Sequence, residues 1–138
     1  MRILGLDIGT RRVGVAVSDA LKKTARPLTV ISPRDLEGEP LGRIVRDYEV
    51  EEIVVGMPTT LRGERGDAAR MAREAMDRLR ASFRVPVVEY DERLTTSMAE
   101  AAMAEAGVSA KERRGKVDMV AAALMLQGYL DRKASKAG

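Results

Sequence analysis

The sequence predicts an α/β fold with a mixed five-stranded sheet that is flanked by helices. Two apolar runs near the N-terminus are separated by a short glycine-containing turn, which is typical of a β-hairpin. Further along, helical apolar patterns alternate with short buried runs, which is typical of parallel βαβ units. The 138 residues are enough for one domain with a sizeable core, and we assign that domain to residues 1–132.

An antiparallel meander of three strands is expected first. We place these strands at residues 2–8, 13–18 and 28–31. The first two flank a tight turn at Gly9, and in the second strand valines alternate with small residues. The third strand is expected to be short because it lies between two prolines, which interrupt strand pairing.

The rest of the chain is expected to alternate helix and strand. The predicted order is a helix at 40–49, a strand at 52–56, a helix at 67–83, a strand at 85–90, a helix from Thr95 or Thr96 to Gly107, and a last helix at 117–132. The last helix is apolar nearly all round, which predicts deep burial against the sheet. Residues 133–138 are expected to form a disordered basic tail.

Two absences restrict the chemistry that is open to this chain. It contains no cysteine and no histidine, which excludes disulfides, thiolate nucleophiles, imidazole zinc sites and every histidine general base. None of its serines lies in a G-x-S-x-G motif. We expect an enzyme of this composition to use carboxylates, hydroxyls, lysine or arginine, together with a hard metal ion.

Basic residues gather in segments that we expect to be loops. The net charge is only +3, but Arg11-Arg12, Arg62 with Arg65, and the run 111–116 form local basic clusters. One such cluster alone is usually solvated loop charge, whereas several of them near candidate catalytic loops favour nucleic-acid binding. One phenylalanine, three tyrosines and no tryptophan offer little to stack on bases, so we expect contacts to backbone and shape.

The sequence also predicts where in the cell the protein is found. It has no run of about eighteen apolar residues, so we expect no membrane span. A strand-like run begins at residue 2, which leaves no room for a signal peptide. A cytoplasmic location is therefore expected.

Three acidic residues occupy positions where ligands bind in a sheet of this kind. Asp7 ends the first strand, Glu92 follows the fifth strand, and Asp118 lies in the first turn of the last helix. Ligands bind at the carboxyl ends of such strands, so we expect the three carboxylates to meet at one edge of the core. Each also has a simpler interpretation: turn chemistry for Asp7, a surface ion pair for Glu92, and a helix-start acid for Asp118.

A cluster of three carboxylates is unfavourable without a cation, because like charges push one another toward protonation. Mg²⁺ prefers oxygen ligands and suits a few carboxylates combined with a substrate phosphate. Two such ions, roughly 3.5–4 Å apart, activate an attacking water and stabilise the leaving oxygen. Such a site needs neither histidine nor cysteine, so Asp7, Glu92 and Asp118 are candidate metal ligands, and the simpler interpretation of each stays open.

Four motifs resemble the YqgF/RuvX family in their order and spacing. They are DIGTRRVGVAVSD, VVGMP followed by a glycine-containing loop, DERLTT, and RRGKVDMVAAALMLQGYL. The resemblance covers nearly the whole chain and implies the RNase H-like fold, which the family shares with Holliday junction resolvases. It also implies a nuclease that depends on Mg²⁺ or Mn²⁺. A lone D-x-G-T would be weak support, because actin-like and sugar-kinase folds use it for nucleotide phosphates.

The resemblance implies roles for individual residues. The three acids match the family's catalytic positions, while Asp91 is either a further metal ligand or a residue that orients Arg93. Arg12 and Arg93 would bind phosphate oxygens, and Thr10 would either contact a phosphate or cap the turn. The candidate nucleic-acid contacts are Thr10, Arg11, Arg12, Arg62, Arg65, Arg93, Arg113, Arg114 and Lys116.

The resemblance favours one function and leaves others open. It implies processing of the 5′ end of precursor 16S ribosomal RNA, with resolution of four-way DNA junctions as the alternative. The expected partners are structured RNA or branched DNA, with ribosomal or maturation factors, and the chain would act as a monomer or a homodimer. Two other classes are a non-catalytic RNA-binding factor and a nucleotide-binding protein of the sugar-kinase kind. The latter normally closes two such domains around its nucleotide, and one domain is expected here.

Overall fold

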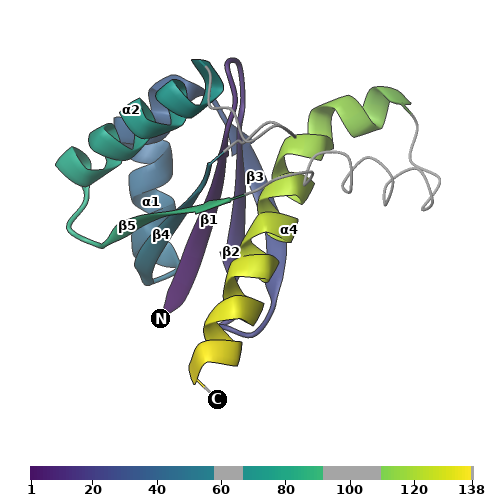
Figure 1. The fold of residues 1–138 in the computed structure, drawn as a ribbon. Helices are drawn as coiled ribbons and strands as arrows, with labels where there is room; N and C mark the ends of the chain where they lie inside the picture. The colour runs from purple at the N-terminus through teal and green to yellow at the C-terminus, as the bar shows by residue number, and fades with distance from the viewer. Residues whose placement is uncertain (58–66, 92–109, 138) are drawn as a thin grey trace.

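The computed structural model describes residues 1–57, 67–91 and 110–137, and Figure 1 shows its fold. A five-stranded sheet lies between helices. The strands are β1 (Arg2–Ile8), β2 (Val13–Ser18), β3 (Ala25–Ile31), β4 (Val50–Met57) and β5 (Val87–Asp91). The helices are the 3₁₀ helix η1 (Pro33–Glu37), α1 (Glu39–Asp47), α2 (Asp67–Ser82) and α4 (Ala110–Ala137).

The sheet is mixed, and its strand order is β3-β2-β1-β4-β5. Strands β1, β2 and β3 pair antiparallel, whereas β4 is parallel to both β1 and β5. Helices α1 and α2 cover one face of the sheet, and α4 crosses the other face (Figure 1). The predicted fold class, an antiparallel meander followed by parallel βαβ units, is confirmed.

Side chains of β1 alternate between two hydrophobic cores. Leu4, Leu6 and Ile8 pack in the core under α1 and α2, whereas Ile3 packs in the core under α4. Successive strand residues point to opposite faces of a sheet. The odd-numbered positions of β1, Asp7 among them, therefore belong to the face that α4 covers.

Helix α4 approaches the sheet most closely at two glycines. A Cβ atom on Gly14 of β2 would lie 1.9 Å from the backbone oxygen of Asp118, and one on Gly5 of β1 would lie 3.0 Å from Cβ of Leu126. No side chain fits at Gly14, so the helix backbone touches the strand there. Gly14 thus allows α4 to bring Asp118 down onto β2.

Strand β3 begins earlier than the predicted range of 28–31, because it starts at Ala25. Pro27 lies at a register shift between this edge strand and β2, where a missing N–H is tolerated. The N–H of Ala25 donates to Oε1 of Gln127 at 2.8 Å. That contact comes from α4, so no local pattern in the sequence reveals it.

The last helix is longer than predicted at both ends. The basic segment 111–116, predicted as a loop, belongs to α4, which begins at Ala110 and continues to Ala137. Gly115 suggests a break in the helix at this point. However, one glycine inside a helix costs only about 1 kcal/mol relative to alanine, and the neighbours of Gly115 are strong helix formers. Residues 133–137, predicted as a disordered tail, are helical as well.

The remaining boundaries lie within two residues of the prediction, and η1 is additional. The loop at 59–66 and the helix predicted from Thr95 or Thr96 to Gly107 fall outside the described residues. In the described ranges, no helix is both long and apolar enough to cross a membrane.

Candidate nuclease site

The turn between β1 and β2 presents three polar side chains at the carboxyl end of β1. The N–H of Gly9 donates to the carbonyl oxygen of Arg12 at 2.9 Å and closes the turn. A Cβ atom on Gly9 would lie 2.6 Å from that oxygen, so the turn requires glycine there. Thr10, Arg11 and Arg12 follow, and all three are exposed.

Asp118 joins this turn to α4. Its Oδ2 lies 3.1 Å from Nε of Arg12, and the side chains are 25% and 49% exposed, respectively. An ion pair this open to water contributes at most about 1 kcal/mol to stability. Its main consequence is positional: a guanidinium from the first turn lies directly beside a carboxylate of the last helix.

Asp7 lies at the same edge and on the same face. It is half-buried in β1 and is in register with Gly14 of β2. The backbone of Asp118 packs directly against Gly14. The backbone of Asp118 therefore contacts the strand partner of Asp7 at the carboxyl end of β1, although the two acids lie far apart in the sequence.

A small hollow of about 170 Å³ opens between the turn and α4. Its lining residues are Gly9, Thr10, Arg11, Arg12 and Asp118. Guanidinium groups bind phosphate oxygens through two parallel hydrogen bonds, and a threonine hydroxyl can donate a further one. The hollow thus combines groups that bind phosphate with a carboxylate that binds a cation.

The other predicted site residues are only partly described. Asp91 is the last residue of β5 and is in register with Met57. Lys116 is exposed on α4, two positions before Asp118. Arg113 and Arg114 belong to α4, but their side chains are outside the described part. Also outside it are Arg62, Arg65, Glu92 and Arg93.

The described donors fit a hard divalent cation. Asp7 and Asp118 offer carboxylate oxygens, which are the ligands that Mg²⁺ and Mn²⁺ prefer. The position of Arg12 beside Asp118 indicates that this carboxylate already attracts positive charge. Within the described residues no group of three histidine, cysteine or acidic side chains is close enough to hold a metal, and Glu92 is not among those residues.

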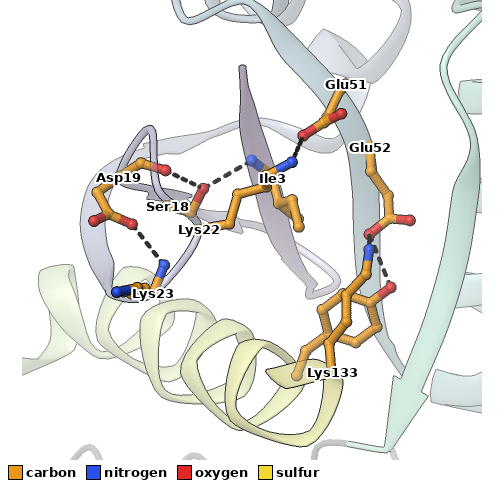
Figure 2. Close-up of polar contacts among 9 residues, drawn as sticks. Ile3, Ser18, Asp19, Lys22, Lys23, Glu51, Glu52 and Lys133 are labelled. Atoms are coloured by element: carbon orange, nitrogen blue, oxygen red, sulfur yellow. Dashed lines mark hydrogen bonds and ion pairs between the residues drawn. The ribbon is translucent and has the colours of Figure 1, made fainter. Parts of the chain in front are cut away.

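A second polar cluster, which sequence reasoning missed, lies at the opposite end of β1 (Figure 2). The N–H of Ile3 donates to Oγ of Ser18 at 2.8 Å, and that hydroxyl donates to the carbonyl oxygen of Asp19 at 2.9 Å. The carboxylate of Asp19 accepts hydrogen bonds from the N–H groups of Lys23 and Thr24, which lower the pKa of Asp19. These contacts stabilise the β2–β3 turn.

The same turn is tied to β4. Lys22 has a φ of 59°, in the left-handed region that non-glycine residues rarely adopt. Its ammonium group pairs with Glu51, and this hydrogen bond lowers the pKa of Glu51 (Figure 2). An aspartate at a strand end is the local signal for such a turn. We assign this cluster a structural role.

The arrangement of strands and helices is that of the RNase H-like nucleases. A structure of Thermus thermophilus RuvC in complex with a Holliday junction substrate resembles the chain with a TM-score of 0.57 at 18% identity. The likeness covers 97% of this chain and 96% of the other. At that identity it establishes the fold alone, and the predicted RNase H-like fold is confirmed.

The chain belongs to the RuvX family, whose model, described as Holliday junction resolvase, matches residues 1–132. A protein of Anaeromyxobacter sp. (strain K) is 47% identical over 137 residues, covering 97% of this chain and 99% of the relative. A protein of Halothermothrix orenii is 47% identical over 133 residues, covering 95% of each. Both are named "Putative pre-16S rRNA nuclease". The predicted family is confirmed.

Proposed function

We propose that this chain is a divalent-metal-dependent nuclease that hydrolyses phosphodiester bonds at the 5′ end of precursor 16S ribosomal RNA. The observation that carries the proposal is the contact of the Asp118 backbone with Gly14, the strand partner of Asp7, beside a turn that bears two arginines. The names of the relatives support ribosomal RNA as the substrate. Action in the cytoplasm follows from that substrate.

Glu92 is the third acid that we propose for the site. In β5, Val88 and Tyr90 pack in the core under α4, whereas Val87 packs in the core under α1 and α2. Even-numbered positions of this strand therefore share the face of Asp7. Glu92 has that parity in the sequence and Asp91 does not, which favours Glu92 as the metal ligand.

Mg²⁺ or Mn²⁺ bound by these carboxylates would supply the charge that activates water and stabilises the leaving oxygen. The chain's own cations bind and orient the substrate. Arg11 and Arg12 border the hollow beside Asp118, so a phosphate placed there meets two guanidinium groups. Lys116 extends the positive charge along α4. We assign the same role to Arg62, Arg65, Arg93, Arg113 and Arg114.

A cleavage assay tests this function. The intact chain and Asp7→Asn are incubated with Mg²⁺ or Mn²⁺ and a 5′-extended 16S precursor, a four-way DNA junction or a generic single strand. We expect precursor cleavage that falls about 100-fold or more in Asp7→Asn. Asp47→Asn is the matched control, because Asp47 is exposed at the end of α1 on the other sheet face. Cleavage that survives in a folded Asp7→Asn would overturn the site.

A second candidate, junction resolution, is favoured by the RuvC-like fold and by the description of the family model. Resolution requires two opposed strands to be cut, which calls for a symmetric dimer. Cutting of the four-way junction by a dimer, with the RNA left intact, would select this function. Metal-independent RNA binding without any cleavage would instead select a non-catalytic RNA-binding factor.

A further inference from the structure

A second hollow, of about 330 Å³, opens on the α4 side of the sheet. Its lining residues are Glu89, Tyr90, Tyr129, Arg132 and Lys133. Tyr129 follows Asp118 by eleven positions on α4, and a rise of 1.5 Å per residue separates them by about 16 Å along the helix. The Tyr129 end of the hollow is therefore separated from Asp118, although both lie on the same helix.

Two of the chain's four phenylalanine and tyrosine residues meet in this hollow. The ring centroids of Tyr90 and Tyr129 lie 5.7 Å apart, and the ring planes cross at 78°. Gly128 faces Tyr90, and a Cβ atom there would lie 3.3 Å from the tyrosine oxygen. A glycine inside a helix lowers its stability. In α4 this glycine leaves space for the side chain of Tyr90.

Hydrogen bonds and charges hold one wall of the hollow in place. The hydroxyl of Tyr129 donates to Oε1 of Glu52 at 2.8 Å, and Nζ of Lys133 lies 3.6 Å from the same oxygen (Figure 2). Lys133 also lies 5.7 Å from the ring centroid of Tyr129. Glu52 thus compensates the charge of Lys133. Arg132 is exposed and has no ion-pair partner among the described residues.

These groups match the parts of an unpaired nucleotide. Tyrosine rings stack on bases of any sequence, and an exposed guanidinium binds a phosphate. A purely apolar ligand would leave the guanidinium of Arg132 unmatched, and an acidic peptide would not use the tyrosine rings for stacking.

We propose that this hollow binds an unpaired nucleotide of a single-stranded RNA segment whose neighbouring part reaches the carboxylate site. The proposal rests on the nuclease function proposed above. At 3.4 Å per stacked nucleotide, the 16 Å along α4 corresponds to about five nucleotides. The base lies against Tyr90, and the phosphate lies at Arg132.

The test is a thermodynamic cycle between protein and RNA, measured by fluorescence anisotropy in EDTA so that no cleavage occurs. A labelled adenosine oligonucleotide is compared with versions in which one position at a time is abasic. We expect one abasic position, and separately Tyr90→Leu, to weaken binding about tenfold each. When the two changes are combined, we expect the loss of binding affinity to be no larger than for either change alone, because both remove the same stacking contact.

Further variants keep the test decisive if Tyr90→Leu does not fold. Arg132→Gln alters an exposed side chain and should weaken binding several-fold, whereas Arg43→Gln, exposed on α1 at the other sheet face, should not. Photo-crosslinking of a 4-thiouridine at the sensitive position should label the peptide that contains Tyr90 or Tyr129.

The outcomes separate this proposal from the nuclease function. Coupled losses in the cycle support the nucleotide site even if no substrate is cleaved. Additive losses, or Arg132→Gln binding like the intact chain, would overturn it even if the RNA precursor is cleaved normally. Asp47→Asn, exposed on α1 at the other sheet face, should bind the oligonucleotide like the intact chain.

Discussion

Arg12 and Asp118 form an ion pair across the candidate site, with Nε of the arginine 3.1 Å from Oδ2 of the aspartate. The pair connects the first turn of the chain to its last helix. A carboxylate that is already beside a guanidinium binds a second cation less readily than a free one does. We therefore expect Arg12 to compete with a metal ion for Asp118 until a substrate phosphate offers the guanidinium another partner.

Substitution of Arg12→Gln should separate metal binding from RNA binding. Because an exposed pair is worth at most about 1 kcal/mol, we expect Mn²⁺ affinity to rise by up to about fivefold, while RNA binding weakens. Isothermal titration calorimetry measures the first quantity and filter binding the second. Arg43→Gln is the control and should change neither. Unchanged or weaker Mn²⁺ binding by Arg12→Gln would contradict the competition.

Gly14→Ala should displace α4 from the sheet, because the new Cβ would lie 1.9 Å from the backbone oxygen of Asp118. Backbone cannot yield as a flexible side chain does, so we expect a loss of about 3 kcal/mol or more in the free energy of unfolding. Urea denaturation measures it, and any residual cleavage activity should fall as well. Gly42→Ala on α1 is the matched control, since its nearest new contact is a flexible arginine end at 3.4 Å.

The control should stabilise the chain slightly, because alanine is the better helix former. Equal stability of Gly14→Ala and Gly42→Ala would mean that α4 does not rest on β2 as described.

Stability at alkaline pH should depend on Tyr129. Burial and the hydrogen bond to Glu52 raise the pKa of Tyr129 from 10 to about 12. The unfolded chain therefore loses this proton first, so the contribution is fully present below pH 10 and is lost as the pH rises toward 12. Lysines titrate in the same range, so the informative quantity is the difference between the intact chain and Tyr129→Phe, measured by urea denaturation from pH 9 to 11.5.

That difference should shrink as the pH rises. Tyr48→Phe serves as the control, and a pH-independent difference for Tyr129→Phe would contradict the role of its hydroxyl.

Stability at acid pH should depend on Asp19. Backbone hydrogen bonds from Lys23 and Thr24 lower the pKa of Asp19 below its usual value of 3.8. The contribution is therefore present above pH 3.8 and is lost as the pH falls through the lower folded value. Asp19→Ala should remove this part of the acid dependence, as followed by thermal melting between pH 2 and 6. Asp47→Ala, exposed on α1, should leave it unchanged.

Local sequence patterns were sufficient to predict most of the strands and helices. Strand alternation around Gly9 predicted the first hairpin to the residue, and buried runs between helical patterns predicted the parallel strands. The same patterns placed Asp7 near the end of the first strand and Asp118 in the last helix, where the structure has them. Sequence alone could not show that the backbone of Asp118 contacts Gly14, since the clash that excludes a side chain comes from a distant helix.

Some features depend on contacts between distant parts of the chain. Strand β3 starts early because Gln127 accepts a hydrogen bond from Ala25. The meeting of Tyr90 and Tyr129, which come from a strand and a helix, likewise could not be predicted from composition. Composition counts residues but does not show which of them gather in one place.

The continuity of α4 has a further consequence. Asp118 and Arg132 lie on one uninterrupted helix, whose rise sets the spacing between them along its axis. An RNA anchored at Arg132 would then be cut at a constant offset, and its products would have one length rather than a ladder of lengths. Evolution could alter the cut position by adding or removing turns of this helix, without any change to the carboxylates that we propose as catalytic.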